Sequence, residues 1–127
     1  MIGVRTSWLA AAFGGGLLLA GCGQQPGAPA WKDFGGDAAR GAVTIDRTAC
    51  GACHEIPGIA NATGLVGPPL KHFARRTVIA GMLPNTPPNL VDWIRYPQSV
   101  APGNAMPNEG LTDAQSRDVA AYLYTLK

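Results

Sequence analysis

Residues 50–54, Cys50-Gly51-Ala52-Cys53-His54, carry the strongest signal in this chain of 127 residues. A Cys-x-x-Cys-His pattern is typical of covalent haem attachment. The spacing has a chemical reason, because each of the two thiols can add to one vinyl group of a haem and form a thioether. The histidine that follows directly can then supply an axial nitrogen to the iron. The motif therefore predicts one haem c bound by Cys50, Cys53 and His54.

Three other uses of two cysteines at this spacing fit the surrounding sequence less well. A thioredoxin-like redox motif needs a βαβ context, whereas helix and loop are predicted here. A zinc site needs four ligands, and the adjacent Cys53 and His54 would have to share one tetrahedron with Cys50 and His72. A disulfide between Cys50 and Cys53 is geometrically possible but leaves His54 without a role. Haem attachment is the interpretation that uses all three motif residues.

The sixth iron ligand decides between electron transfer and the binding of an external ligand. A methionine thioether paired with histidine suits haem iron and raises its potential. Met106 lies in a loop rich in proline and glycine, which can hold a sulfur at a fixed height, and it is the favoured ligand. Met82, His72 and an open sixth site are the alternatives, although Met82 also suits a core gap and His72 a place at the surface or core edge.

The clearest predicted element is a helix near the carboxyl terminus. Thr112 and Gln115 form a capping box, which fixes where this helix begins. Apolar residues then follow at helical spacing: Val119, Tyr122, Leu123 and Leu126.

Helices and loops account for the rest of the predicted domain. Asp37 can cap a first helix, Gly81 can end a short second one and Pro97 can stop a third. The three predicted helices cover residues 38–49, 70–80 and 89–96, with loops at 61–69 and 99–110. No segment shows the alternation of a strand, so the expected fold class is all-α.

The amino-terminal residues indicate an export signal. Arg5 precedes an apolar run over residues 8–20, which is shorter than the roughly 20 residues that a membrane-spanning helix needs. The end of the run, Leu19-Ala20-Gly21-Cys22, resembles the lipobox of bacterial lipoproteins. The resemblance implies cleavage before Cys22 and acylation of this residue, since stable anchoring needs two or more acyl chains.

A plain signal peptide with an incidental cysteine is the alternative. The expected organisation is a lipoprotein signal peptide at residues 1–21, a lipid-anchored linker at 22–34 and a folded domain at 35–127. One acylated cysteine and two cysteines that bind haem would account for all three cysteines of the chain.

The charge balance argues against a nucleic-acid partner. The chain has ten basic and eight acidic residues, and removal of residues 1–21 would take away Arg5 and no acidic residue. The mature polypeptide would therefore be almost neutral, whereas nucleic-acid binding favours a strong basic excess.

Several short motifs follow the haem motif along the chain: Gly67-Pro68-Pro69-Leu70, Trp93, Pro97, Pro102-Gly103 and Met106-Pro107. With these motifs the chain resembles, from about residue 41 to residue 126, the monohaem class I cytochromes c. This resemblance implies about three main helices, with short helices and loops, around one covalent haem.

A second set of motifs is Arg76-Thr77, Ala80-Gly81, Leu83-Pro84-Asn85-Thr86-Pro87 and Trp93-Ile94. With this set the chain resembles, more narrowly, the cytochrome c domain fused to subunit II of caa3-type oxidases. The printed sequence contains no copper-binding cupredoxin part, which leaves the immediate redox partner open.

The resemblance to class I cytochromes c implies roles for individual residues around the haem. The Pro68 carbonyl would accept a hydrogen bond from the second ring nitrogen of His54, which orients this ligand. Leu70 would pack on the haem, and Trp93 would lie near the methionine ligand. Arg76 would lie near a haem propionate, although a solvated arginine is the alternative.

Two more implied contacts are less central to the haem. Asn85 would hydrogen-bond a propionate, or would simply belong to a turn. Gly41 would let the first helix cross the last one closely against Tyr122.

These features together predict an electron carrier rather than an enzyme. The expected protein is a monomer on the extracytoplasmic, periplasmic side of a bacterial membrane. It would pass single electrons from a cytochrome bc1 complex or a dehydrogenase to a terminal oxidase. A fixed haem c subunit of a dehydrogenase or oxidase is the first alternative, and a haem enzyme or gas sensor with an open sixth site is the second. Gly23 after the lipobox resembles outer-membrane sorting, whereas coupling to an oxidase favours the cytoplasmic membrane.

Overall fold

The computed structural model describes residues 34–127 of the chain. The expected signal peptide at residues 1–21, the acylated Cys22 and residues 22–33 of the expected linker lie outside this range. The described part is mostly helical, with five α-helices, a single-turn 3-10 helix and one two-stranded hairpin. No helix within residues 34–127 has both the length and the apolar character needed to cross a membrane.

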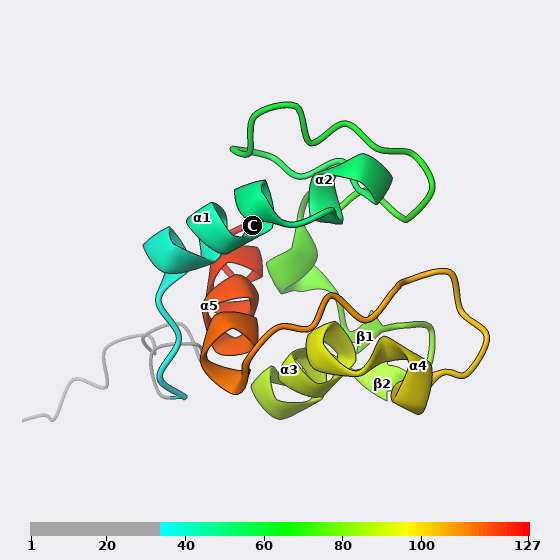
Figure 1. The fold of residues 1–127 in the computed structure, drawn as a ribbon. Coiled ribbons are helices and arrows are strands. Elements are labelled where there is room, and N and C mark those ends of the chain that lie inside the picture. The colour runs from blue at the N-terminus through cyan, green and yellow to red at the C-terminus, as the bar shows by residue number, and fades with distance from the viewer. Residues whose placement is uncertain (1–33) are drawn as a thin grey trace, which may run out of the picture.

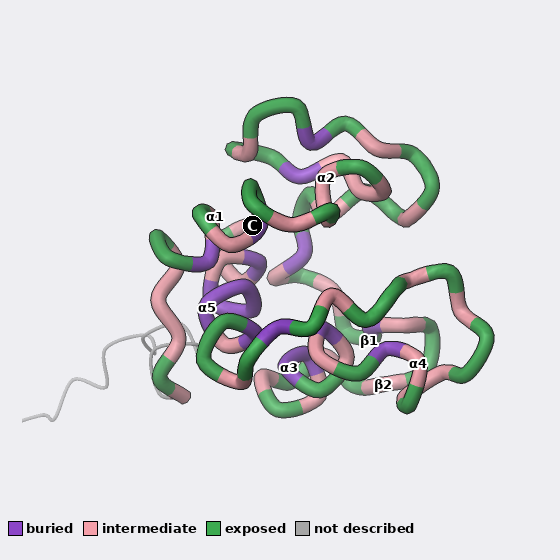
Figure 2. Tube along the Cα trace, in the orientation of Figure 1, coloured by how far each residue is buried: buried purple, intermediate pink, exposed green. Residues whose placement is uncertain are grey.

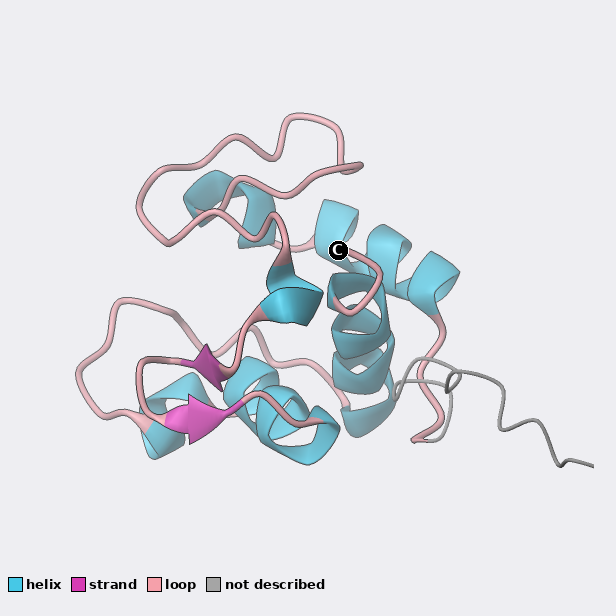
Figure 3. Cartoon of the chain, turned by 180° about the vertical axis from the view of Figure 1, so that it is seen from behind, coloured by secondary structure: helices cyan, strands magenta, loops and turns pink. Residues whose placement is uncertain are grey.

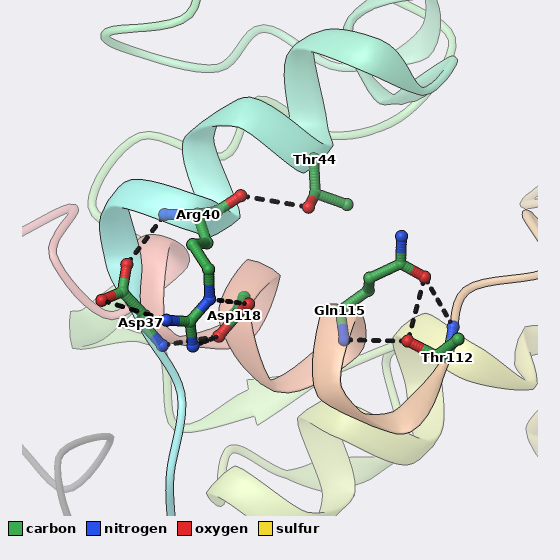
Figure 4. Close-up of polar contacts among 6 residues, drawn as sticks. All are labelled: Asp37, Arg40, Thr44, Thr112, Gln115 and Asp118. Atoms are coloured by element: carbon green, nitrogen blue, oxygen red, sulfur yellow. Dashed lines mark hydrogen bonds and ion pairs between the residues drawn. The ribbon is translucent and has the colours of Figure 1, made fainter.

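The first and last helices are defined by side-chain caps that the sequence predicts. Helix α1 (Ala38–Arg47) begins where the Asp37 carboxylate accepts a hydrogen bond from the Arg40 backbone N–H at 2.8 Å. Helix α5 (Asp113–Leu123) begins at the predicted capping box. There the Thr112 Oγ1 accepts from the Gln115 N–H, and the Gln115 Oε1 accepts from the Thr112 N–H (Figure 4). Both starts are therefore set by local chemistry that a sequence can reveal.

Helices α1 and α5 cross closely and bring the two ends of the domain together (Figure 1). A Cβ at Gly41 would overlap the Asp118 carbonyl oxygen and lie 3.1 Å from the Tyr122 Cβ. The close crossing against Tyr122 is therefore present, and its tightest contact is with the Asp118 backbone. Glycine is needed at position 41 because a side chain has no room there.

An ion pair fixes the angle of the same crossing (Figure 4). The Arg40 guanidinium donates from Nε and Nη2 to the two carboxylate oxygens of Asp118, at 2.8 Å and 2.9 Å. The Asp37 backbone N–H donates to Asp118 Oδ1 at 2.7 Å. The Asp118 side chain is buried, whereas that of Arg40 is 64% exposed, so solvent screens part of the interaction.

Asp118→Asn is expected to lower the free energy of unfolding by about 2 kcal/mol at pH 7, because charge-assisted hydrogen bonds are lost. Burial alone would raise the pKa of Asp118. The hydrogen bonds from Arg40 and the Asp37 backbone, with the charge of Arg40, outweigh it and lower this pKa below its ordinary value of 3.8. The carboxylate therefore adds stability above pH 3.8, and this stability is lost as the pH falls through the lower pKa of the folded protein.

Denaturant unfolding of wild type and Asp118→Asn between pH 7 and pH 2 measures this contribution. The gap between the two should close in the acidic part of the range. Asp46→Asn, at an exposed position of α1, is the control and should leave stability nearly unchanged. A gap that is constant with pH would contradict the assignment.

Helix α3 (Pro87–Arg95) packs against α5 and buries Leu90, Val91 and Ile94. Two prolines occupy its first turn. They cost no hydrogen bond there, because the backbone N–H groups of a first turn have no acceptor within the helix. The helix ends before Pro97 as predicted, but Pro97 also starts a further short helix, α4 (Pro97–Val100). The sequence prediction missed α4 because its four residues are too few for periodicity to show.

The helix predicted at residues 70–80 is wrong. His72 adopts a left-handed conformation with φ of 56°, and only a single 3-10 turn (Phe73–Arg75) follows it. Strands β1 (Val78–Ile79) and β2 (Leu83–Pro84) then form an antiparallel hairpin (Figure 3). Gly81, expected to end a helix, has φ of 71° in the hairpin turn. Strands of two residues are too short to show alternation, so no pattern in the sequence predicts them.

The core forms where these elements meet (Figure 2). Helix α5 contributes Val119, Ala120 and Leu123 to it, and α3 faces it from one side. Figure 1 shows α2 (Cys50–Cys53) and the long loop after it on one side of α5, and α3, α4 and the hairpin on the other. Residues from both sides line one cavity, and this cavity is the candidate site.

Candidate haem site

A cavity of about 470 Å³ lies between the two sides of the domain, with a predominantly apolar lining. Cavities of this size typically hold a small organic ligand or cofactor. Its walls come from α1, α2, α3, α5, the 3-10 turn, β1 and the loops that follow α2 and α4. All eight residues that the sequence predicts around a haem line it: Cys50, Cys53, His54, Pro68, Leu70, Arg76, Trp93 and Met106.

The two cysteines lie on a single helical turn, α2. Residues three positions apart on a helix share one face, so Cys50 and Cys53 can both line the same wall. Both are free thiols. Burial raises the pKa of the Cys50 thiol above its ordinary value, the negative charge of Glu109 raises it further, and a contact of 3.1 Å with the Thr48 hydroxyl opposes both. Before a thioether forms, Cys50 is therefore a protonated thiol at neutral pH.

The His54 ring is held so that one nitrogen remains for a metal. Its Nδ1 lies 2.7 Å from the Pro68 carbonyl oxygen. A carbonyl can only accept, so Nδ1 carries the hydrogen and Nε2 has the free lone pair. The Gly67 N–H donates to the Cys53 carbonyl at 2.8 Å, and a Cβ at Gly67 would overlap the His54 ring. The loop is therefore shaped to enclose this imidazole.

The structure separates the candidates for the sixth ligand. Met106 reaches the cavity from the loop after α4. Met82 lies in the hairpin turn, is 58% exposed and lies outside the cavity lining. The His72 Nδ1 donates to the Lys127 carbonyl oxygen at 2.7 Å, and His72 also lies outside the lining. Among the three, only Met106 lines the cavity.

Arg76 and Asn85 differ in what they can offer a ligand. The Arg76 guanidinium donates to the Pro69 carbonyl, lies 5.2 Å from the Phe73 ring centroid and lines the cavity, with further N–H groups to spare. The Asn85 amide is fully used within the protein. It donates to the carbonyls of Phe73 and Arg76 and accepts from the Tyr124 hydroxyl. Asn85 therefore belongs to the turn, which is the alternative that the sequence left open.

Three polar residues around the site were not predicted from the sequence. Glu109 lines the cavity and lies close enough to Cys50 for its charge to affect that thiol. Gln98 and Asn104 hold the backbone of Met106 through their side-chain amides. No motif marks these residues. The partners of Gln98 and Asn104 are backbone groups brought close by the turn at α4, and Glu109 affects a thiol that lies 59 positions earlier in the chain.

The cavity fits a haem in its size, its apolar lining and its donor atoms. Cys50 and Cys53 would form the thioethers, and His54 and Met106 would supply nitrogen and sulfur to the iron. Within residues 34–127 no three histidine, cysteine or acidic side chains gather as they would around a bare metal ion. The donor set therefore suits an iron that is already held by a porphyrin.

A mostly helical domain with this motif and this cavity defines a class, the small proteins that bind haem c covalently. Comparison with known proteins makes the assignment specific. Residues 38–127 match the family model described as Cytochrome c, and the chain belongs to the cytochrome c family. A covalent haem c and a role in electron transfer follow from this membership.

Two curated relatives narrow the comparison. Cytochrome c oxidase subunit 2 of Alkalihalophilus pseudofirmus (strain OF4) is 37% identical over 89 residues, which cover 69% of this chain and 25% of the relative. The protein with the same name from Bacillus sp. (strain PS3) is 36% identical over 87 residues, which cover 65% and 24%. The chain thus spans about a quarter of the length of the curated relatives it matches. The predicted similarity to an oxidase-fused cytochrome c domain is confirmed.

Proposed function

We propose that this protein is a lipid-anchored electron carrier with a single haem c, which passes electrons from a respiratory donor to a terminal oxidase. The observation that carries the proposal is the cavity itself. It brings Cys50, Cys53 and His54 together with Met106, which lies more than 50 residues further along the chain. The donor would be a cytochrome bc1 complex or a dehydrogenase, and the protein would work as a monomer.

The residues around the cavity support transfer of electrons rather than chemistry on a substrate. The haem would supply a one-electron couple between its ferric and ferrous states. His54 and Met106 would both bind the iron, which would leave no coordination site for a substrate. Leu70, Phe73 and Trp93 line the cavity with apolar surface and exclude water from it. The fixed His54 ring keeps its ligand atom in place when the charge of the site changes.

An uncharged rim beside the cavity supports docking to a redox partner. Residues 56–70 include no charged side chain. Within this segment Leu65 is 88% exposed, and Val66 is 74% exposed and lines the cavity. Gly64 and Gly67 on either side are packed too tightly against α2 and His54 to carry a Cβ. This rim would present Leu65 and Val66 to the electron-entry surface of a terminal oxidase.

The proposed location rests on the sequence of the leader. An acylated Cys22 would hold the protein on the extracytoplasmic side of a bacterial membrane, with residues 23–34 as a tether. Mass spectrometry of the native protein tests this directly. The proposal expects the polypeptide from Cys22 onwards, one haem and an acyl modification in the same molecule, and an unmodified amino terminus would overturn it.

A fixed subunit of an oxidase is the second candidate function, and both curated relatives favour it because they are named as oxidase subunits. Purification of the oxidase from detergent-solubilised membranes distinguishes the two. A carrier is lost during washing with salt and detergent, whereas a subunit remains in a one-to-one ratio with the oxidase.

Leu65→Ser is expected to slow oxidation of the reduced protein by a purified terminal oxidase a few-fold, because an exposed apolar contact is lost. Stopped-flow mixing measures the rate. The visible spectrum should stay unchanged, and Val43→Ser is the control, since Val43 is also exposed but belongs to α1. The almost neutral chain further predicts that salt changes the rate only modestly. A steep fall with salt, or equal rates for Leu65→Ser and wild type, would contradict this docking surface.

Glu109→Gln is expected to raise the midpoint potential of the haem by a few tens of millivolts, on the order of 1 kcal/mol for one electron. The carboxylate lies at the cavity wall, where a negative charge favours the more positive ferric state. Asp46→Asn removes an equal charge from an exposed position outside the cavity lining and should barely move the potential. A spectroelectrochemical titration measures both, and a potential that falls or stays constant in Glu109→Gln would contradict the effect.

A further inference from the structure

The backbone of Met106 is held on both sides by side-chain amides. Its N–H donates to the Asn104 Oδ1 at 2.7 Å, and its carbonyl accepts from the Gln98 Nε2 at 2.8 Å. All three residues are partly buried. The position of Met106 therefore depends on two side chains outside its own residue.

The two side-chain amides also make hydrogen bonds that join α4 to the loop after it. The Gln98 Nε2 also donates to the Asn104 carbonyl at 2.9 Å, and its Oε1 accepts from the Gly103 N–H at 3.3 Å. The Asn104 Nδ2 donates to the carbonyls of Pro97 and Ala101, at 2.8 Å and 2.6 Å. Each amide thus uses two donors and one acceptor. The orientation of both is fixed, since carbonyls only accept and backbone N–H groups only donate.

These contacts connect the Met106 loop to a rigid base. Gln98 belongs to α4, and Asn104 is tied to the first residue of α4 and to its C-cap. Pro97 is fully buried, which fixes α4 against the core. Gly103 joins this network only through its backbone N–H, which donates to Gln98 Oε1, since a Cβ at this position would meet open space. Proline and glycine give this loop its shape, and the two amides fix its distance from the core.

We propose that Gln98 and Asn104 are positioning residues that keep the Met106 sulfur in place as an iron ligand and so protect the iron from external ligands. This inference rests on the proposed function, in which Met106 is the sixth ligand. A thioether is a weak ligand on a loop, so each constraint on its backbone lowers the entropy that ligation costs. Loss of either amide frees the loop, and a competing ligand then displaces Met106 more readily.

The experiment titrates the ferric holoprotein with imidazole and follows loss of the weak red-edge band from methionine to iron. Gln98→Ala and Asn104→Ala are expected to mature with haem and to show the band without imidazole. Imidazole should displace it at roughly tenfold lower concentration than in wild type, as expected for the loss of one or two hydrogen bonds. Asn108→Ala, an exposed amide of the same loop, is the control and should titrate as wild type does.

A second titration in a Met106→Ala background, followed by the shift of the main haem absorption band on imidazole binding, separates positioning from general loosening of the pocket. If the amides act through Met106, Gln98→Ala and Asn104→Ala no longer change the imidazole affinity in that background. An equal effect in both backgrounds, or a wild-type titration of the single variants, would overturn the inference and leave Met106 ligation standing. A Met106→Ala protein that keeps the band would overturn Met106 ligation and the inference with it. Gln98→Met and Asn104→Leu, of similar volume without these donors, replace any alanine variant that fails to mature.

Discussion

Met106→Ala is expected to lower the midpoint potential by on the order of 100 mV or more and to abolish the methionine-to-iron band, because a soft sulfur ligand favours the ferrous state and axial ligands set haem potentials over a wide range. The variant should still bind haem covalently, since Cys50 and Cys53 are untouched. Potentiometric titration with spectra of the ferric protein measures both effects. External ligands such as imidazole should also bind directly to the iron.

Met82→Ala is the control for this prediction. Met82 is exposed in the turn between β1 and β2 and lies outside the cavity lining, so its loss should change neither the potential nor the band. If Met82→Ala removes the band and Met106→Ala keeps it, the ligand assignment is wrong. If wild type lacks the band altogether, the open sixth site gains support, and with it a role in enzyme chemistry or gas binding.

Gly41→Ala is expected to lower the free energy of unfolding of the holoprotein by about 3 kcal/mol. At an ordinary helix position the same substitution has the opposite effect, because alanine stabilises a helix relative to glycine by about 1 kcal/mol. The new Cβ would overlap the Asp118 carbonyl oxygen, which belongs to the backbone of α5. Relief requires α1 and α5 to separate, and the ion pair from Arg40 to Asp118 opposes this movement.

Gly81→Ala is the comparison for that variant. Gly81 has φ of 71°, and a Cβ there would meet open space, so only the local backbone strain of about 1 kcal/mol is expected. Guanidinium unfolding followed by circular dichroism measures both proteins. If both variants are destabilised equally, α1 and α5 can move apart to accept a methyl group, and their close contact contributes little to the free energy of unfolding.

The sequence predicts those parts of the fold and the site that depend on residues close together in the chain. Cys50, Cys53 and His54 form a motif, and the capping box at Thr112 marks where α5 begins. The resemblance to known cytochromes c supplied the hydrogen bond between His54 and Pro68 and the crossing at Gly41, and both are present in the structure.

The parts that the sequence does not predict depend on contacts between distant residues. Asp118 lies on a helix whose polar residues look solvated in the sequence, and only the crossing with α1 reveals its burial and its pairing with Arg40. The hairpin at residues 78–84 holds too few residues for a pattern. Gln98 and Asn104 bind backbone groups rather than side chains. Every residue has such groups, so the sequence does not show which of them will be bound.

The crossing of α1 and α5 also sets the order in which the domain can be completed. The hydrogen bond from Asp37 to Asp118 joins residues separated by 81 positions, almost the whole domain, so it forms only after the last helix has been synthesised. Val119 and Leu123 of that helix line the cavity, which means that one wall is absent while the Cys50–His54 segment is already exposed. The cavity around the Cys50–His54 segment is therefore complete only when α5 has packed against α1 and α3.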